Sequence, residues 1–247
     1  MSRGTRFIIL AAPRTGSNLL CTLLNSHPEV LCHHELFNPN GIFYALDYRD
    51  GTLDLGSMEA RDRDPFLFLQ RVWVHPQGAS CVGFKMTRGQ NDVVMRTLID
   101  DPGVLKIVLF RGNRLKTFVS EQLARQTDRW EVYARDEIAI ATPKLHVDVE
   151  SFKAHCDLNK RFYQDIQNSL QSSRQPWIDT TYETILAGSE QVRLLEFLGV
   201  GETQVGLTQS SIKQSDTDLR THIENYEELE LALEGSEYLA ELYDCEN

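Results

Sequence analysis

The chain has 247 residues, 41% hydrophobic and 25% charged, which is typical of a globular protein that needs no disulfide or structural metal. Its formal net charge of -11 is uneven: Glu224–Asn247 holds nine acids and no Lys or Arg, leaving 27 acids against 25 bases in the body. A nearly neutral body lacks the basic face of a general nucleic-acid binder, and no apolar run approaches membrane-spanning length.

The five cysteines show no metal-ligand spacing, so reduced thiols and no bound metal are expected. The N-terminus runs directly into the apolar residues 7–10 without the longer apolar region of a signal peptide. These features together predict a cytoplasmic protein.

Short apolar runs predict strands at residues 7–12, 30–32, 81–86, 106–110 and 177–181. Apolar residues at helical spacing predict helices at 19–24, 64–74, 92–99, 115–125, 152–170, 192–198 and 226–233. Segment 47–65, rich in Asp, Arg and Gly, is predicted to be a loop. Alternating strands and helices indicate an α/β fold, a central parallel sheet flanked by helices, in a single domain over residues 1–247.

The loop Pro13–Asn18 joins the first predicted strand to the first helix, where α/β folds commonly bind phosphates. Gly16 lets the backbone approach a ligand, Ser17 and Asn18 can cap the helix and donate hydrogen bonds, and Arg14 adds a fixed positive charge. The loop is neither a Walker A motif nor a GxGxxG fingerprint. A simple turn with a helix cap is the alternative.

The segment Ala12–Leu20, APRTGSNLL, resembles the 5'-phosphosulfate loop of sulfotransferases that use PAPS (3'-phosphoadenosine 5'-phosphosulfate). It is most similar to the bacterial branch that includes the nodulation-factor and trehalose sulfotransferases. The resemblance implies a P-loop-like fold, PAPS as the donor, PAP as the desulfated product, and no metal. It implies that Arg14 faces the sulfuryl group or the bridging oxygen, and that the donor is bound by Arg14, Thr15, Gly16, Ser17 and Asn18.

A second motif combines Arg111, at the end of a predicted strand, with Ser120 on the next helix. Arginine offers a bidentate fork for phosphate and serine a short O–H donor. The same resemblance implies that Arg111 and Ser120 bind the 3'-phosphate of PAPS, whereas a solvated Arg and a routine helix Ser are the alternative. Gly112-Asn113 departs from the pattern usual in the relatives.

The segment around Lys213 and Gln214 resembles the C-terminal loop that closes over the nucleotide in this family. The resemblance implies that both residues contact the donor, and a surface Lys is the alternative. The stretch Thr181–Leu186 resembles another family segment, for which a structural role is expected.

The acceptor must lose a proton, and Glu35 matches the position of the base in the resembled branch. A partly desolvated carboxylate near an anionic donor is expected to have a raised pKa. His33 and His34 are rivals for this role. His33 and Glu35 would share a face if the strand extends that far. Lys85, a charge inside an apolar strand, is a possible active-site residue.

These features predict transfer of a sulfuryl group from PAPS to a hydroxyl of a carbohydrate, glycolipid or specialised small molecule by in-line displacement. A P-loop-like kinase would need a loop Lys and a Mg²⁺ carboxylate, and a non-catalytic PAP-binding protein is the other alternative. Acceptor contacts are expected in the long segments 47–65 and 134–149. No motif of the sequence specifies the acceptor. The acidic C-terminal helix is either a homodimer surface or a solvated face.

Overall fold

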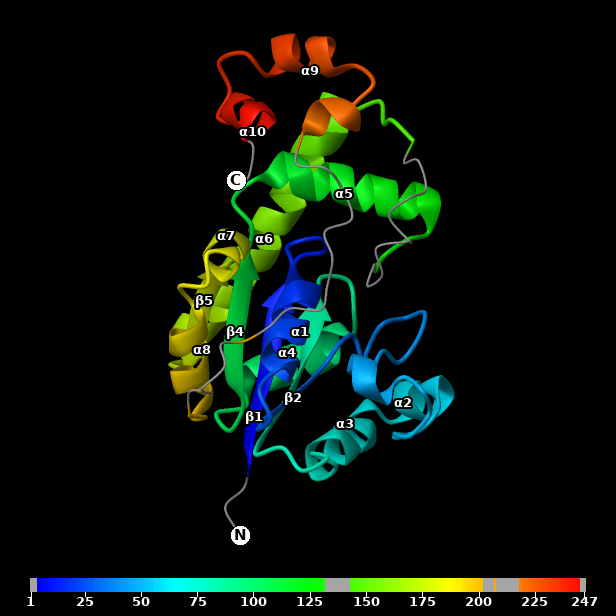
Figure 1. The fold of residues 1–247 in the computed structure, drawn as a ribbon, viewed down its shortest axis with the longest axis vertical. Coiled ribbons are helices and arrows are strands. Elements are labelled where there is room, and N and C mark those ends of the chain that lie inside the picture. The colour runs from blue at the N-terminus through cyan, green and yellow to red at the C-terminus, as the bar shows by residue number, and fades with distance from the viewer. Residues whose placement is uncertain (1–3, 132–142, 202–206, 208–217, 245–247) are drawn as a thin grey trace.

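The computed structural model describes residues 4–131, 143–201, 207 and 218–244 (Figure 1). Its centre is a five-stranded sheet in the order β2-β3-β1-β4-β5, and every neighbouring pair is parallel. The strands are β1 (Thr5–Ala11), β2 (Val30–His33), β3 (Cys81–Thr87), β4 (Leu105–Phe110) and β5 (Trp177–Thr181). The predicted α/β fold with a parallel sheet is therefore confirmed.

The described helices are α1 (Ser17–Asn25), α2 (Met58–Arg63), α3 (Pro65–Val74), α4 (Asp92–Asp100), α5 (Arg114–Thr127), α6 (Val149–Ser173), α7 (Tyr182–Leu186), α8 (Gln191–Leu198), α9 (Tyr226–Leu233) and α10 (Leu239–Tyr243). Short 3-10 turns occupy Leu46–Tyr48 and Leu219–Thr221. No helix of the described part of the chain combines the length and apolar character that crossing a membrane requires.

The central strand β1 is apolar on both faces because helices cover both faces of the sheet. Ile8 and Leu10 pack into a cluster with residues of α3, α4 and α6. Phe7, Ile9 and Ala11 pack on the opposite side, in a cluster with residues of α1, α7 and α8. Burial on both faces makes the strand a continuous apolar run, which is why its position could be predicted.

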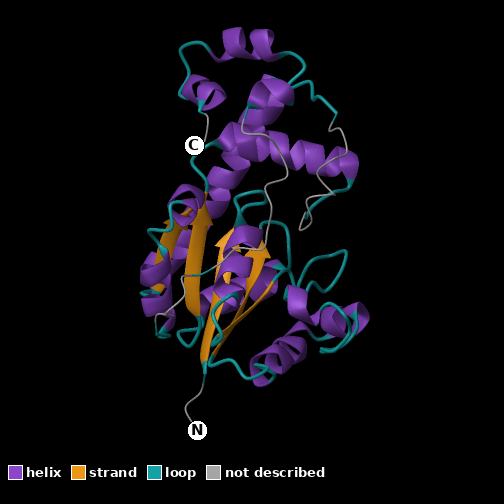
Figure 2. Cartoon of the chain, in the orientation of Figure 1, coloured by secondary structure: helices purple, strands orange, loops and turns teal. Residues whose placement is uncertain are grey.

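A third apolar cluster lies beyond the carboxyl ends of the strands, where α5, α9, α10 and the first turns of α6 form a helical layer (Figure 2). Leu115, Phe118 and Phe152 belong to this cluster, together with Tyr226 and Leu229. The carboxyl edge of the sheet therefore faces α5, and α/β proteins place their ligands at this edge.

The prediction that 47–65 is entirely loop is wrong for 58–63, which forms α2. Ser57 caps this helix by accepting a hydrogen bond from the Ala60 amide. Arg61 is buried and donates to the carbonyls of Leu36, Asn38 and Gly41. Hydrogen bonds from polar residues, a cap and a buried arginine, thus hold α2 in place. A search for hydrophobic periodicity does not detect such a helix.

Candidate active site

The loop between β1 and α1 leads directly into the N-terminus of α1. Gly16 is the N-cap residue, with φ of +90°, and no side chain of the described residues caps it. A Cβ at this position would lie 2.4 Å from the ring of Tyr182. Glycine is therefore required both for the left-handed backbone and for the close approach of Tyr182. The first-turn N–H groups of α1 provide the positive end of a helix dipole to this loop.

Tyr163, on α6, fixes the beginning of the loop to the sheet. Its hydroxyl accepts a hydrogen bond from the Ala12 amide at 2.8 Å and donates to the Leu109 carbonyl at 2.7 Å. Burial raises the pKa of Tyr163 to about 12, so the hydroxyl remains protonated and able to donate. Thr15 tightens the turn by donating from Oγ1 to the Ala12 carbonyl at 2.8 Å.

Arg14, Arg111 and Ser120 converge beside this loop, although they are far apart in the sequence. Arg14 Nε donates to Ser120 Oγ at 2.9 Å, and Arg111 Nη1 donates to the Arg14 carbonyl at 3.3 Å. The Arg111 guanidinium also stacks over the Tyr182 ring, 4.4 Å from its centroid. Burial and the neighbouring charge of Arg111 lower the pKa of Arg14 to about 10, which leaves the Arg14 guanidinium cationic at neutral pH. The two predicted donor-binding motifs thus form one cluster.

The turn after β4 is well defined despite its departure from the family pattern. The Gly112 amide donates to Glu183 Oε1 at 3.0 Å. Asn113 caps α5 by accepting from the Lys116 amide at 2.8 Å, and its own amide donates to the Glu241 carbonyl at 2.8 Å. The Gly-Asn pair therefore positions α5, and with it Ser120, on the carboxyl edge of the sheet.

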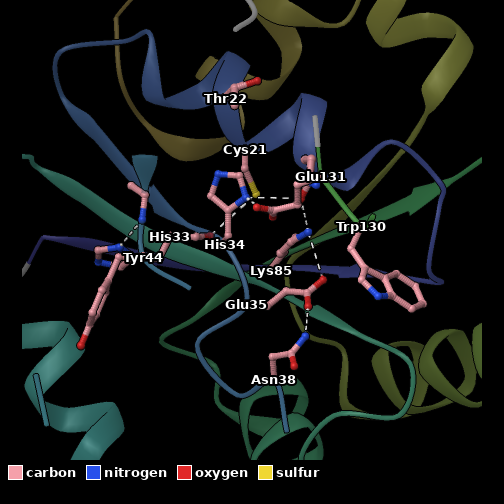
Figure 3. A network of polar contacts seen from close by, with 12 residues as sticks. Cys21, Thr22, His33, His34, Glu35, Asn38, Tyr44, Lys85, Trp130 and Glu131 are labelled. Atoms are coloured by element: carbon pink, nitrogen blue, oxygen red, sulfur yellow. Dashed lines mark hydrogen bonds and ion pairs between the residues drawn. The ribbon is translucent and has the colours of Figure 1, made fainter. Parts of the chain in front are cut away.

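A second group of polar residues surrounds Glu35, just after β2 (Figure 3). The buried ammonium of Lys85, on β3, lies 3.0 Å from Glu35 Oε1 and also donates to Asn18 Oδ1 of α1. The amide of Asn38 donates to the other carboxylate oxygen of Glu35. Lys85 thus connects Glu35, the candidate base, to the first turn of α1. This turn directly follows the loop that contains Arg14 and Gly16, which is the proposed donor loop.

The expected rise in the pKa of Glu35 is not found. Burial alone raises the pKa of Glu35. The charge of Lys85 and the hydrogen bonds from Asn38 and Lys85 lower it by more than burial raises it. The pKa of Glu35 therefore lies below its ordinary value, and the carboxylate is ionised at neutral pH. The sequence prediction considered desolvation and could not include Lys85, which is 50 residues away.

The two histidines are arranged differently from the prediction. β2 ends at His33, so the strand alternation does not extend to Glu35. His33 is fully buried, accepts a hydrogen bond from the Ala45 amide and lies edge-on to Tyr44. Burial, then the neighbouring His34, lowers the pKa of His33 to about 3, which makes it a weak base. His34 instead lies 3.3 Å from Asn18, and burial keeps its pKa below the ordinary value.

Glu131 and Arg49 complete this region, and the sequence analysis singled out neither residue individually. Arg49 Nη1 lies 2.7 Å from Glu131 Oε2, and His34 Nδ1 lies 3.4 Å from Glu131 Oε1. Just before Glu131, the Trp130 carbonyl accepts a 2.5 Å hydrogen bond from Arg14. Arg49 lies within the segment predicted to contact the acceptor.

The remaining predicted residues are placed as follows. Thr15 is buried in the loop, and Ser17, also buried, and Asn18 lie in the first turn of α1. Lys213 and Gln214 lie outside the described residues, as does most of segment 134–149. Tyr182 contacts both predicted donor-binding motifs, through Gly16 and Arg111. It falls in the stretch Thr181–Leu186, for which only a structural role was expected. The aromatic residue in that stretch was the available sequence signal.

Comparison with known proteins finds no matching family model. Nodulation protein H of Rhizobium meliloti is 27% identical over 241 residues, covering 94% of this chain and 92% of that protein. The protein of the same name from Rhizobium tropici is 24% identical over 242 residues, covering 94% and 90%. A sulfotransferase structure from Alicyclobacillus acidocaldarius is 17% identical and covers 96% of this chain and 94% of its own, with a TM-score of 0.49. The chain is a distant homologue of nodulation protein H, the sulfotransferase branch that its two motifs resemble.

Proposed function

We propose that this protein is a PAPS-dependent sulfotransferase that moves a sulfuryl group to an acceptor hydroxyl by in-line displacement. The observation that carries the proposal is the convergence of Arg14, Arg111 and Ser120 beside the Gly16 loop. Homology to nodulation protein H over nearly the whole chain supports the same enzyme class.

The donor side has the chemistry that a phosphorylated nucleotide requires. Burial and the charge of Arg111 lower the pKa of Arg14, so an anionic ligand placed beside these two guanidiniums would be stabilised electrostatically. In this proposal Arg111 and Ser120 hold the 3'-phosphate of PAPS, and Arg14 with the loop from Thr15 to Asn18 holds the 5'-phosphosulfate. Bound PAPS would supply an activated sulfuryl group and a stable leaving group.

The acceptor side has a carboxylate suited to take a proton. Glu35 is ionised, partly exposed, and held by Lys85 and Asn38 in a fixed orientation. It would accept the proton of the attacking hydroxyl, while Lys85 holds the carboxylate against the first turn of α1. Positioning and charge stabilisation by these residues would account for most of the catalysis.

The acceptor class proposed is a carbohydrate, a glycolipid or a specialised small molecule bearing a hydroxyl. The similarity to nodulation protein H supports a search that begins with sugar-containing compounds. Exposed polar residues of the segment after β2, including Arg49, are the proposed acceptor contacts, and Lys213 and Gln214 are proposed to contact the nucleotide.

The first experiment is calorimetric titration of PAP into the wild-type protein, the Arg111→Ala variant and an Arg96→Ala control. Arg96 is an exposed arginine on α4, so its removal changes net charge equally without changing the proposed site. Loss of a charged phosphate contact should weaken PAP binding by about 2–4 kcal/mol, whereas the control should bind as the wild type.

ATP and NAD serve as competing nucleotides in the same titrations. Selective binding of PAP that Arg111→Ala loses is the expected result. Absence of PAP binding by folded wild-type protein would overturn the proposal. Preferential binding of ATP with Mg²⁺ would support a kinase instead.

A further inference from the structure

The dipeptide Trp130–Glu131, which follows α5, contacts both sides of the site. The Trp130 carbonyl accepts a hydrogen bond from Arg14 of the donor loop. The next side chain, Glu131, forms an ion pair with Arg49 and lies beside His34, the residue before Glu35. Two successive residues therefore connect the donor loop to the strand end that carries the candidate base.

From Glu131 a continuous series of polar contacts leads to Glu35 (Figure 3). His34 Nδ1 lies within 3.4 Å of Glu131 Oε1 and within 3.3 Å of Asn18 Oδ1. The same Asn18 oxygen accepts a hydrogen bond from Lys85, whose ammonium contacts Glu35 at 3.0 Å. Displacing Glu131 would therefore disturb partners that fix Glu35, although the two carboxylates do not touch directly.

The burial of these groups makes the arrangement sensitive to charge. The side chains of Glu35 and Glu131 are 19% and 22% exposed, and that of Lys85 is 4% exposed. In Figure 3 the Lys85 ammonium lies between the two carboxylates. Two partly buried anions beside one buried cation are stable only with further compensation, which Arg49 provides to Glu131.

Glu35 is faced by charged groups from several elements. Lys85 on β3 favours the ionised carboxylate, and Glu131 after α5 opposes it. Arg14 from the donor loop also interacts with Glu35, whereas burial keeps His34 neutral near pH 7. Glu131 therefore counteracts part of the effect of Lys85 on the base.

We propose that Glu131 is a positioning residue for Glu35, which docks the segment after α5 onto the acceptor side and balances the charge of Lys85. This inference rests on the proposed function and adds a second functional carboxylate to it. Without Glu131, the ammonium of Lys85 would bind Glu35 more tightly, and the base would be less able to accept a proton.

The test is a pH titration of Glu35 in the whole protein, followed by carbon-13 NMR of labelled glutamate carboxyl groups. The Glu35→Gln variant identifies the Glu35 signal. In Glu131→Gln the titration midpoint of Glu35 should move to lower pH by about 0.5, because an opposing negative charge is lost. Glu131→Asp, which keeps the charge, should stay closer to the wild type.

Glu150→Gln is the matched control, because Glu150 also pairs with a base, Lys153, but on the exposed surface of α6. It should leave the Glu35 titration unchanged. An unchanged midpoint in both Glu131→Gln and Glu131→Ala would overturn the inference. PAP titrations of the same variants report separately on the donor loop, where loss of the Glu131 negative charge near Arg14 should not weaken the binding of the anionic PAP. Failure of the wild type to bind PAP would instead reject the proposed function. The NMR titration would still show whether Glu131 affects Glu35, because it requires no PAP.

Discussion

The proposed donor side and the proposed acceptor side of this site differ in how their charged groups are arranged. On the donor side, the guanidiniums of Arg14 and Arg111 lie close together, and their contacts include the Ser120 hydroxyl, the Trp130 carbonyl and the ring of Tyr182. On the acceptor side, Lys85 and Arg49 each contact a carboxylate, so the charges are already paired. The difference teaches that one side is arranged to receive an anion, whereas the other is arranged to hold its own groups in place.

The sharpest test of this comparison is Glu35→Gln, which keeps the shape of the acceptor side and removes its base. Turnover of PAPS with a hydroxyl acceptor should fall by about 10²–10⁴-fold, the usual contribution of a general base. PAP affinity should not fall in parallel with turnover, because Glu35 makes no proposed contact with the nucleotide and its negative charge near Arg14 does not favour an anion. Near wild-type turnover, measured by PAP release, would remove Glu35 as the base.

The pairing on the acceptor side can be broken with Lys85→Met. Leaving Glu35 without its buried cation should lower the free energy of unfolding by about 3 kcal/mol and raise the pKa of Glu35. Urea denaturation measures the first effect and carboxyl NMR the second. In the control Lys153→Met, an exposed i,i+3 pair on α6 is lost, and the expected change is below about 0.5 kcal/mol. Equal effects in the two variants would contradict a buried, functional pair.

The donor side can be tested with Gly16→Ala. The left-handed φ and the clash with Tyr182 should together cost about 1–3 kcal/mol, seen as lower stability and weaker PAP binding. Adding Tyr182→Ala removes the clash but not the backbone strain, and it also removes the ring under Arg111. Tyr182 is also buried in the core cluster that contains Phe7 and Ile9, so its removal leaves a cavity, and neither stability nor PAP affinity should recover in the double variant. Full recovery of PAP affinity would show that Tyr182 has no role in the donor site.

The dependence of stability on pH tests the burial of His33. Its folded-state pKa of about 3 lies below its ordinary value of about 6.5, so the unfolded chain binds the proton first. The stabilising contribution is therefore present above pH 6.5 and is lost as pH falls towards 3, by at most about 1.4 kcal/mol per pH unit. His33→Gln should have a shallower slope of stability against pH in this window, and the exposed His75→Gln should match the wild type. Identical slopes for all three proteins would contradict this assignment.

Much of the fold could be predicted because both faces of the strands are buried, so that β1 and β4 are continuous apolar runs. Helices such as α7 and α10, with five residues each, are too short to show periodicity, and α2 owes its stability to the buried Arg61. These elements depend on tertiary contacts, which a linear pattern does not contain.

The same distinction applies to the site. The loop around Gly16 is a local motif, and Arg111 with Ser120 spans only one turn and part of a helix, so both could be recognised. Glu131 reaches His34 across 97 residues, and no spacing rule indicates such a contact. The pKa of Glu35 was predicted in the wrong direction for the same reason, because Lys85 approaches it from another strand.

The helical layer above the sheet has a separate apolar cluster, and α5 belongs to that layer and not to either cluster on the sheet. Ser120 is therefore carried by the helical layer, whereas Gly16 is carried by the sheet. A cooperative sub-global opening of the layer would dismantle donor binding while the sheet stayed folded. Donor binding should accordingly slow amide hydrogen exchange in α5 and α9 more than in β1, because a ligand held by both the layer and the sheet opposes opening of the layer.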